Sequence, residues 1–467
     1  MNSYDVAIIG SGPGGYVAAI RCAQLGMKTA IIEKYSTLGG TCLNVGCIPS
    51  KALLDSSHHY EDAVKHFEEH GIDIPGDIKV NLKQMIARKQ SVVDQTTGGI
   101  DFLMKKNKID VIMGYGKVIA GKKVEVTDKD GKKSEYAANK GVIIATGGRA
   151  RELPNVKIDG TKVIEYRKAM SLEKQPESLL VIGSGAIGVE FAYVYAAMGT
   201  KVTIVEFLPT MVPVEDEDVS KELAKQYKKL GVDVYVNSSV EKVDTSGKGC
   251  KVSVKTPNGE KTFEVDVVLS AAGVVANLEN IGLEEMKINT ERGKIVVNEW
   301  YETNVPGYYA IGDCTPGPAL AHVATAEGII CAEKIAGHKT EALDYNNIPG
   351  CTYCQPEIAS VGMTEKKARE AGYDIKVGKF PFMASGKASA AGAKDGFVKV
   401  IFDAKYGEFL GAHMIGYNVT EMIAEVVVAR KLETTSHEIL RSVHPHPTMS
   451  EAVKGATEAA YGEAIDL

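Results

Sequence analysis

The chain has 467 residues, of which 44% are hydrophobic and 24% are charged. This length predicts two to four domains, and a formal net charge of -6 argues against nucleic acid or an anionic membrane surface as a partner. No apolar run is long enough to span a bilayer, and the N-terminal MNSYDVAIIG lacks the basic region of a signal peptide. We therefore expect a cytoplasmic protein.

The first pattern along the chain is a repeat. Residues 4–33 predict a strand, a glycine turn, a helix and a second strand, and residues 178–206 repeat that order. Each second strand ends in an acid, Glu33 or Glu206, eighteen residues beyond the last glycine of a G-x-G-x-x-G motif. The glycines of the two motifs are Gly10, Gly12 and Gly15, and Gly183, Gly185 and Gly188.

This pattern is typical of dinucleotide binding. The first glycine allows a tight turn, the second lets the backbone approach a pyrophosphate, and the third lets helix and strand pack closely. The pyrophosphate lies at the helix N-terminus, and the acid accepts a hydrogen bond from a ribose hydroxyl. Two complete copies predict two dinucleotides, of which the usual pairing is a bound FAD and an exchanging nicotinamide. Glu206 would repel a 2′-phosphate, so NAD is favoured over NADP.

The remaining segments predict further elements between and after the two copies. After the second copy, residues 265–272 predict a buried strand, and 308–314 a strand that ends in Asp313. From about residue 344 the pattern changes to that of a separate α+β domain. The other expected elements are a helix at 81–105, short strands around 109–126, the segment VIIATGG at 142–148, and a helix at 322–337.

Two cysteines, Cys42 and Cys47, lie five residues apart in the segment GGTCLNVGCIPSK. They could form a disulfide, a metal site or two core thiols. No further Cys or His stands at ligand spacing, which disfavours a metal. In an ideal helix their Cα atoms would be roughly 8.7 Å apart, too far for a disulfide, so the segment must turn or begin a distorted helix. A thiol near a helix N-terminus has a lowered pKa, which favours a redox-active pair.

With these motifs in place, the chain resembles the flavoprotein disulfide reductases that bind two dinucleotides. The resemblance runs from the first glycine loop to HPHPTMSEAV and is closest in GGTCLNVGCIPSK. It implies that Cys42 exchanges with the substrate sulfur, while Cys47 faces the flavin. Lys51 would lie near the reactive flavin nitrogen and pair with Glu190.

The same resemblance assigns an acid–base dyad to His446 and Glu451, supplied by the other subunit of a homodimer. A histidine can accept a thiol proton near neutral pH, and a carboxylate can hold its tautomer. His444 has similar neighbours but lacks the matching position. Further cofactor-binding positions implied by the resemblance are Thr146, Gly147, Asp313 and Gly273.

Within the family, the sequence is most similar to the branch that oxidises dihydrolipoamide bound to proteins of multienzyme complexes. Glutathione-specific members carry a serine and an arginine where this chain has Pro13 and Ile20. A reductase for another disulfide, or a flavoprotein that serves as a docking subunit, remain the alternatives. Cys351 and Cys354 form a C-x-x-C that we interpret as two packed thiols, and we expect no metal site.

The expected fold is α/β, with two Rossmann-type dinucleotide-binding domains, a central domain and a C-terminal α+β dimerisation domain. The boundaries expected for these parts are 1–148 for the FAD-binding domain, 149–271 for the NAD-binding domain, 272–343 for the central domain and 344–467 for the interface domain. The resemblance implies FAD and NAD as cofactors, a lipoyl-bearing protein as partner and a homodimer.

Overall fold

The computed structural model describes residues 2–467 and divides into two units, each built from three stretches of the chain. The first unit comprises Met1–Ala52, Lys83–Arg151 and Gly273–Leu343. The second comprises Leu53–Leu82, Glu152–Ala272 and Asp344–Leu467. The boundaries of four separate domains stay a prediction.

The first unit is built on a seven-stranded sheet. Its strands pair in the order β3 (Asp110–Met113), β2 (Thr29–Glu33), β1 (Asn2–Ile9), β6 (Lys133–Ile144), β5 (Lys123–Thr127) and β4 (Tyr115–Ile119), with β19 (Tyr308–Ala310) on β6. The strands β3, β2, β1 and the end of β6 run parallel, whereas β4 and β5 are antiparallel. Ile8 and Ile31 fill the core on one face of this sheet, and Ile9 and Ile32 fill the core on the other. Both faces are therefore covered, as parallel sheets require.

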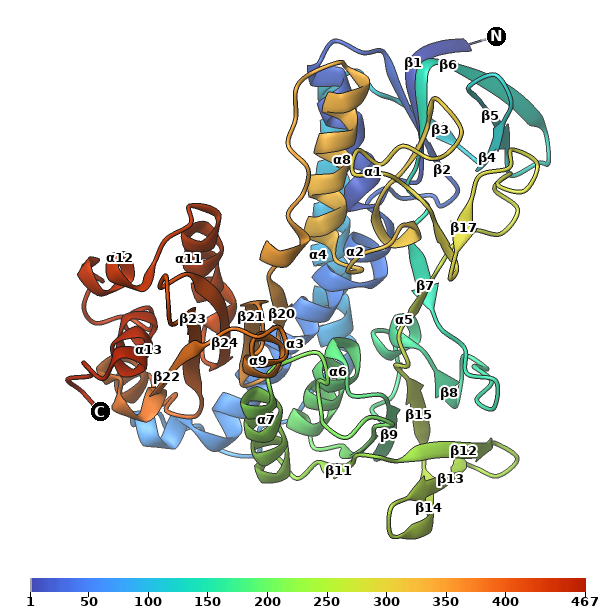
Figure 1. Ribbon diagram of the computed structural model, residues 1–467. Helices are drawn as coiled ribbons and strands as arrows, with labels where there is room; N and C mark the ends of the chain where they lie inside the picture. Colours follow the sequence, from blue (N-terminus) through green and yellow to red (C-terminus); the bar gives the residue numbers. More distant parts are fainter. Residues whose placement is uncertain (1) are drawn as a thin grey trace. The chain divides into compact units, whose positions relative to one another are not determined.

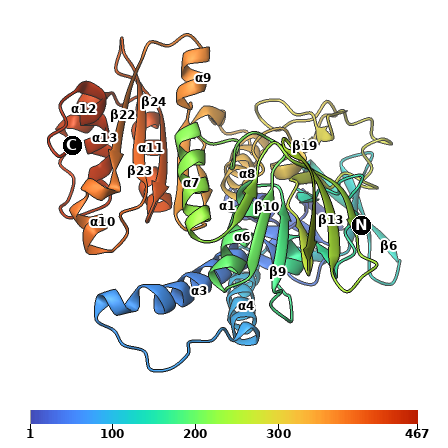
Figure 2. The same ribbon diagram turned by 90° about the horizontal axis from the view of Figure 1, so that it is seen from below.

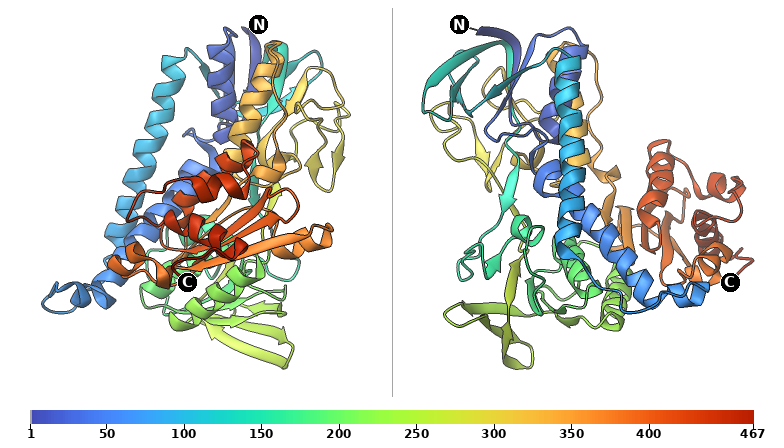
Figure 3. Two further views of the ribbon diagram at one scale, coloured as in Figure 1. Left: turned by 60° about the vertical axis from the view of Figure 1, so that its left-hand side comes forward. Right: turned by 180° about the vertical axis from the view of Figure 1, so that it is seen from behind.

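Two helices of the first unit, α1 (Pro13–Gln24) and α8 (Ala321–Ile335), lie side by side against the sheet (Figure 1). They approach closely because a side chain at Gly328 would stand 2.7 Å from the carbonyl oxygen of Gly14. The long helix α4 (Leu82–Lys106) adds Met104 to the same core and is seen at full length in Figure 3. The smaller elements are α2 (Gly40–Val45), β7 (Gly148–Ala150), β16 (Val274–Ala276), β17 (Thr290–Glu291), β18 (Lys294–Ile295) and the 3₁₀ turn η2 (Gly312–Cys314).

The second unit contains a five-stranded parallel sheet. Its order is β11 (Asp233–Tyr235), β10 (Lys201–Val205), β9 (Ser178–Ile182), β15 (Val267–Ser270) and β8 (Val163–Ile164). The nearly all-apolar helix α6 (Ala186–Ala197) connects β9 to β10 and is buried along most of its length. Further elements are α5 (Tyr166–Ala169), α7 (Glu217–Lys229) and the antiparallel strands β12 (Ser239–Asp244), β13 (Cys250–Thr256) and β14 (Gly259–Val265).

The C-terminal part of the second unit has an antiparallel sheet of its own, with α11 (Val419–Lys431) and α13 (Glu451–Tyr461) packed on it (Figure 2). Its strands pair in the order β20 (Gly350–Thr352), β21 (Glu357–Gly362), β24 (Phe409–Gly416), β23 (Phe397–Asp403) and β22 (Ile375–Pro381). The first residues of α3 (Cys47–Lys65), up to Ala52, belong to the first unit, and the rest belong to the second. The remaining helices of the second unit are α9 (Glu365–Glu370), α10 (Gly386–Ala390) and α12 (Ser436–Arg441), with 3₁₀ turns η1 (Phe67–His70), η3 (Tyr345–Asn347) and η4 (Phe382–Ala384).

The predicted α/β class, the doubled strand–helix–strand and the C-terminal α+β part are confirmed. One predicted strand is shorter than expected. The strand expected to end in Asp313 stops at Ala310, and Asp313 lies in the following 3₁₀ turn. Gly312 begins that turn at φ +73°, a conformation that ends an extended strand.

Candidate active site

The first glycine loop has little room except at its middle glycine. A Cβ at Gly10 would stand 2.2 Å from the carbonyl oxygen of Ala145, and one at Gly15 would stand 1.9 Å from that of Gly10. A Cβ at Gly12 would meet its nearest atom only at 4.0 Å. Packing therefore requires the first and third glycines, whereas the second faces open space at the N-terminus of α1. No side chain caps that helix, and its first turn has no acid, so its free N–H groups suit a pyrophosphate.

The second glycine loop repeats this arrangement in the second unit. A Cβ at Gly183 would stand 2.7 Å from the oxygen of Ala271, and one at Gly188 would stand 2.0 Å from that of Gly183. A Cβ at Gly185 would have no atom within 4 Å. The helix that follows also lacks a side-chain cap and an acid in its first turn. The residues of both loops thus fit a dinucleotide.

The two acids at the strand ends are buried and held in the same way. Glu33 accepts hydrogen bonds from the backbone N–H and the hydroxyl of Ser11 at 3.0 and 2.6 Å, and Glu206 accepts the same pair from Ser184 at 2.7 and 2.9 Å. These serines stand between the first two glycines of each motif. The sequence shows the repeated serine, but its contact with the acid becomes visible only in the structure.

The other residues expected to bind a cofactor lie in the first unit with the first loop. Thr146 and Asn277 are joined by two hydrogen bonds, of 2.8 and 3.0 Å. Gly147 and Gly273 have positive φ angles, and a Cβ on either would meet no atom within 4 Å. Burial raises the pKa of Asp313, and the nearby charge of Lys294 opposes this shift. Lys294 also donates a hydrogen bond to the backbone oxygen of Asp313.

The two cysteines of the candidate site flank a break between two helices. The helix α2 ends at Val45, and α3 begins at Cys47, with Gly46 between them. A side chain at Gly46 would stand 2.8 Å from the oxygen of Thr41 and 3.2 Å from the Cα of Cys42, so only glycine lets the chain pass this close. The turn expected from the spacing of the cysteines is confirmed.

The side chains of Cys42 and Cys47 are hydrogen-bonded to each other. The hydrogen bond between the Cys42 and Cys47 side chains and the burial of Cys42 raise the pKa of Cys42 well above its usual range, whereas the charge of Lys51 lowers it. Cys42 is partly buried, and Cys47 is exposed. The individual roles of the two cysteines stay a prediction.

Lys51 and Glu190 belong to different units, and their pairing stays a prediction. Lys51 lies one turn beyond Cys47 on α3 and is 3.4 Å from the hydroxyl of Ser50. Glu190 is 5% exposed on α6, and its carboxylate accepts the backbone N–H of Tyr353 at 3.0 Å. Tyr353 was not expected at this place, because nothing in the sequence indicates that its backbone meets α6.

His446 and Glu451 are brought together in the second unit. His446 Nδ1 is 2.9 Å from Glu451 Oε1, and the other carboxylate oxygen accepts the N–H of Thr448 at 2.8 Å. Burial raises the pKa of Glu451, but the hydrogen bonds from Thr448 and His446 outweigh it and leave that pKa below its usual value. The His446 side chain is 79% exposed, and the His446–Pro447 peptide bond is cis.

His444, which lacks the position expected for the dyad, has a carboxylate partner of its own. Its Nε2 is 2.7 Å from Glu425 Oε1 on α11, and its side chain is 8% exposed. The hydrogen bond to Glu425 raises the pKa of His444. Glu425 lies 19 residues away and gave no signal in the sequence.

Cys354 is fully buried, and its sulfur contacts the oxygen of Pro356 at 3.3 Å. Burial raises the pKa of Cys354. Among residues 2–467, no group of three or more His, Cys, Asp or Glu side chains is arranged to hold a metal ion. The same residues contain no helix that is long and apolar enough to cross a membrane.

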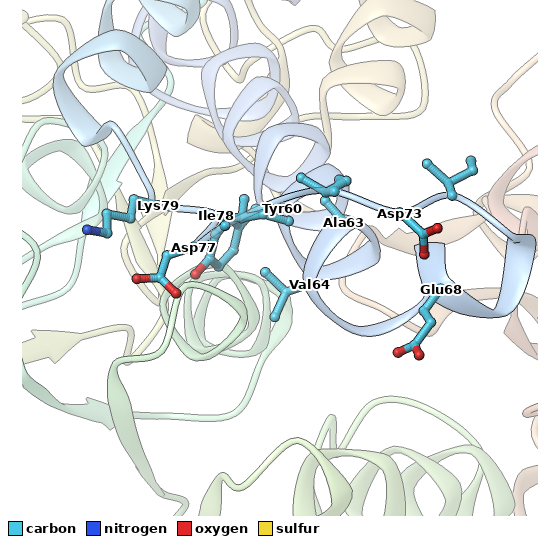
Figure 4. A pocket seen from close by; sticks show the side chains of 11 residues that line it. Tyr60, Ala63, Val64, Glu68, Asp73, Asp77, Ile78 and Lys79 are labelled. Atoms are coloured by element: carbon cyan, nitrogen blue, oxygen red, sulfur yellow. The ribbon is translucent and has the colours of Figure 1, made fainter.

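A separate hollow of about 590 Å³ lies beside the end of α3 and the segment that follows it (Figure 4). Val64 and Ile78 line it, together with the acids Glu68, Asp73 and Asp77. It contains none of the residues expected to bind a cofactor or to carry the thiol chemistry.

Comparisons with known proteins identify the family. Residues 4–328 match the pyridine nucleotide-disulphide oxidoreductase family, and residues 348–457 match the dimerisation domain of that family. A dihydrolipoyl dehydrogenase of Rhizobium etli is 46% identical over 99% of each chain. The mitochondrial dihydrolipoyl dehydrogenase of Pisum sativum is 44% identical over 99% of this chain and 92% of its own.

Solved structures lead to the same family. The crystal structure of LpdA from Mycobacterium tuberculosis has a TM-score of 0.89 at 27% identity, covering 98% of this chain and 99% of its own. The copper(II) complex of the HOCl-induced flavoprotein disulfide reductase RclA from Escherichia coli has a TM-score of 0.87 at 29% identity, with the same coverage. The chain belongs to the pyridine nucleotide-disulphide oxidoreductase family.

Proposed function

We propose that the chain is a dihydrolipoyl dehydrogenase, which oxidises protein-bound dihydrolipoamide to lipoamide and reduces NAD+ to NADH. The observation that carries this proposal is the hydrogen-bonded pair Cys42 and Cys47 in the unit that also contains the first glycine loop. The identity of 46% to a dihydrolipoyl dehydrogenase over almost the full length supports the choice of substrate.

The thiol chemistry begins with the oxidised pair. A thiolate of dihydrolipoamide attacks the Cys42 sulfur, the Cys42–Cys47 bond breaks, and Cys47 leaves as a thiolate. The second substrate thiol then attacks the mixed disulfide, so lipoamide leaves with its own S–S bond and the cysteine pair holds two electrons. FAD, when bound, supplies the acceptor for this electron pair and allows its transfer as hydride to NAD+.

A base is needed because the attacking species is a thiolate. We assign this role to the Nε2 of His446, whose Nδ1 is occupied by Glu451. This histidine would accept the proton of the incoming thiol and release it to solvent. The dyad would serve the cysteines of the other subunit in a homodimer, in line with the dimerisation domain at residues 348–457.

The cofactors would be held by the two glycine loops. FAD fits the first loop, Glu33 and the segment with Thr146, Gly147 and Asp313, which lie in one unit. NAD fits the second loop and Glu206, which lie together in the second unit. The partner would be a lipoyl-bearing protein of a multienzyme complex in the cytoplasm.

A reductase for another disulfide is the second candidate, because a flavoprotein disulfide reductase has a similar structure. Glutathione is disfavoured as the disulfide substrate, because Pro13 and Ile20 stand where glutathione-specific members carry a serine and an arginine. The test is NADH formation from dihydrolipoamide and NAD+, run beside NADPH oxidation with glutathione disulfide, on flavin-containing protein. NADH formation without glutathione turnover is the expected result. Flavin-containing protein that does not turn over dihydrolipoamide would refute the assigned substrate.

A further inference from the structure

Each glycine loop contains a serine whose hydroxyl donates a hydrogen bond to a glutamate carboxylate. Ser184 donates both its backbone N–H and its hydroxyl to Glu206 Oε2, and Leu208 N–H reaches Oε1 at 2.8 Å. In the first loop, Ser11 makes the same two bonds to Glu33 Oε2, and Tyr35 N–H reaches Oε1 at 2.9 Å. Three donors therefore hold each carboxylate in the same pattern, in two different units.

This pattern restricts what the serine can do for a ligand. A serine hydroxyl has one proton to donate, and here that proton goes to the carboxylate. The serine is therefore not a donor to a phosphate. The carboxylate, in contrast, keeps acceptor capacity, because each of its oxygens can accept two hydrogen bonds and Oε1 receives one from the backbone. Glu206 is 6% exposed and Ser184 fully buried, so little water competes for this arrangement.

We propose that Ser184 and Ser11 are positioning residues, which fix the carboxylates of Glu206 and Glu33 in the orientation that accepts an adenosine ribose hydroxyl. Ser184 thereby sets the affinity for NAD+, and Ser11 sets the retention of FAD. This inference rests on the proposed function in taking FAD as the ligand of the first loop and NAD as the ligand of the second. Without the serine hydroxyl, only the two backbone N–H groups would hold each carboxylate, and its remaining freedom would be lost when the nucleotide binds, which weakens binding.

The test compares holoprotein with the variants Ser184→Ala and Ser220→Ala. Ser220 is a buried serine on α7 in the same unit, and its hydroxyl has no hydrogen-bond partner, so its variant controls for the loss of a buried hydroxyl. The dissociation constant of NAD+ for the oxidised holoprotein is measured by calorimetry. Ser184→Ala should weaken NAD+ binding about tenfold, which is about 1.4 kcal/mol, whereas Ser220→Ala should not change it.

A second ligand separates positioning from a general loosening of the loop. The NAD+ analogue with a 2′-deoxyadenosine ribose lacks the hydroxyl that Glu206 would accept. It should bind wild-type protein more weakly than NAD+, and Ser184→Ala should then have little further effect, because the interacting pair is already broken. An equal loss for both ligands would overturn the inference, as would unchanged NAD+ binding in Ser184→Ala.

The experiment also distinguishes this inference from the proposed function. Wild-type holoprotein that fails to bind NAD+ would refute the function itself. If wild type and Ser184→Ala both bind NAD+ with the same affinity, only the role of the serine would be refuted. For the first loop, Ser11→Ala should release its flavin during dialysis faster than wild type, measured by absorbance, and equal retention would remove Ser11 from this role.

Discussion

His446 Nδ1 lies 2.9 Å from Glu451 Oε1, and the N–H of Thr448 holds the second oxygen of the same carboxylate. Because a carboxylate only accepts, Nδ1 must carry the proton, and the lone pair of the neutral ring is on Nε2. The dyad thus presents a base on a side chain that is 79% exposed.

Replacing His446 by Gln should lower the turnover of dihydrolipoamide by about 10²-fold or more, the usual contribution of a general base. Glu451→Gln should lower it less, because the base remains but loses the partner that fixes its tautomer. His437→Gln, at an exposed histidine at the start of α12, is the matched control. Steady-state turnover rates of the three variants, measured across pH, would check this prediction. Near-normal turnover in His446→Gln would show that His446 is not the base.

Gly185 and Gly183 should respond differently to alanine. Gly185 has φ -66° and open space around it, so Gly185→Ala should fold as wild type but bind NAD+ about tenfold or more weakly. Gly183 has φ +97°, a conformation that costs alanine about 1–2 kcal/mol even before its clash with Ala271. Gly183→Ala should therefore lower the melting temperature. Normal NAD+ affinity in Gly185→Ala would contradict a pyrophosphate at that loop.

The His444–Glu425 pair should stabilise the fold in a pH-dependent way. The pKa of His444 is raised by its hydrogen bond to Glu425, so the folded state binds a proton more tightly than the unfolded state. This stabilisation is fully present below the unfolded pKa of about 6.5 and is lost as pH rises through the folded value. The difference in melting temperature between wild type and His444→Gln should therefore shrink from pH 6 to pH 9. A constant difference would contradict the ion pair.

Lys399 should be important for the stability of the second unit. It is 3% exposed on β23, and its ammonium lies 2.8 Å from Asp216 and Glu365 and 3.1 Å from Asp218. Lys399→Ala would leave the buried carboxylate of Asp216 without its cation and should lower the free energy of unfolding by about 3–5 kcal/mol.

The exposed Lys379, 3.6 Å from Asp218, provides the control for this ion-pair network. Lys379→Ala should cost less than about 1 kcal/mol, as exposed pairs do. Denaturant unfolding measures both variants, and equal losses would contradict the importance of burial.

The sequence predicted those features that depend on local spacing. The two glycine loops, their acids and the turn between the cysteines follow from residues close together in the chain, where backbone sterics dictate the outcome. The dyad of His446 and Glu451 is also local, at five residues apart. Its role, however, came from a resemblance and not from the spacing.

Contacts between distant residues were not predictable in this way. Glu425 meets His444, and Lys399 meets Asp216 across 183 residues, because sheet and helix packing brings them together. The hydrogen bond from the Ser184 hydroxyl to Glu206 is another such contact, between residues 22 positions apart in the sequence. No local periodicity encodes such pairs, since they depend on how complete elements pack.

The central claim is that Cys42 and Cys47 accept electrons from dihydrolipoamide. Oxidised holoprotein would be mixed anaerobically with one equivalent of dihydrolipoamide, without NAD+, then treated with an alkylating agent and analysed by peptide mass spectrometry. The account predicts that both cysteines resist alkylation before mixing and become alkylated afterwards, while the buried Cys354 remains unmodified. Equal alkylation of Cys42 and Cys47 before and after mixing would contradict it.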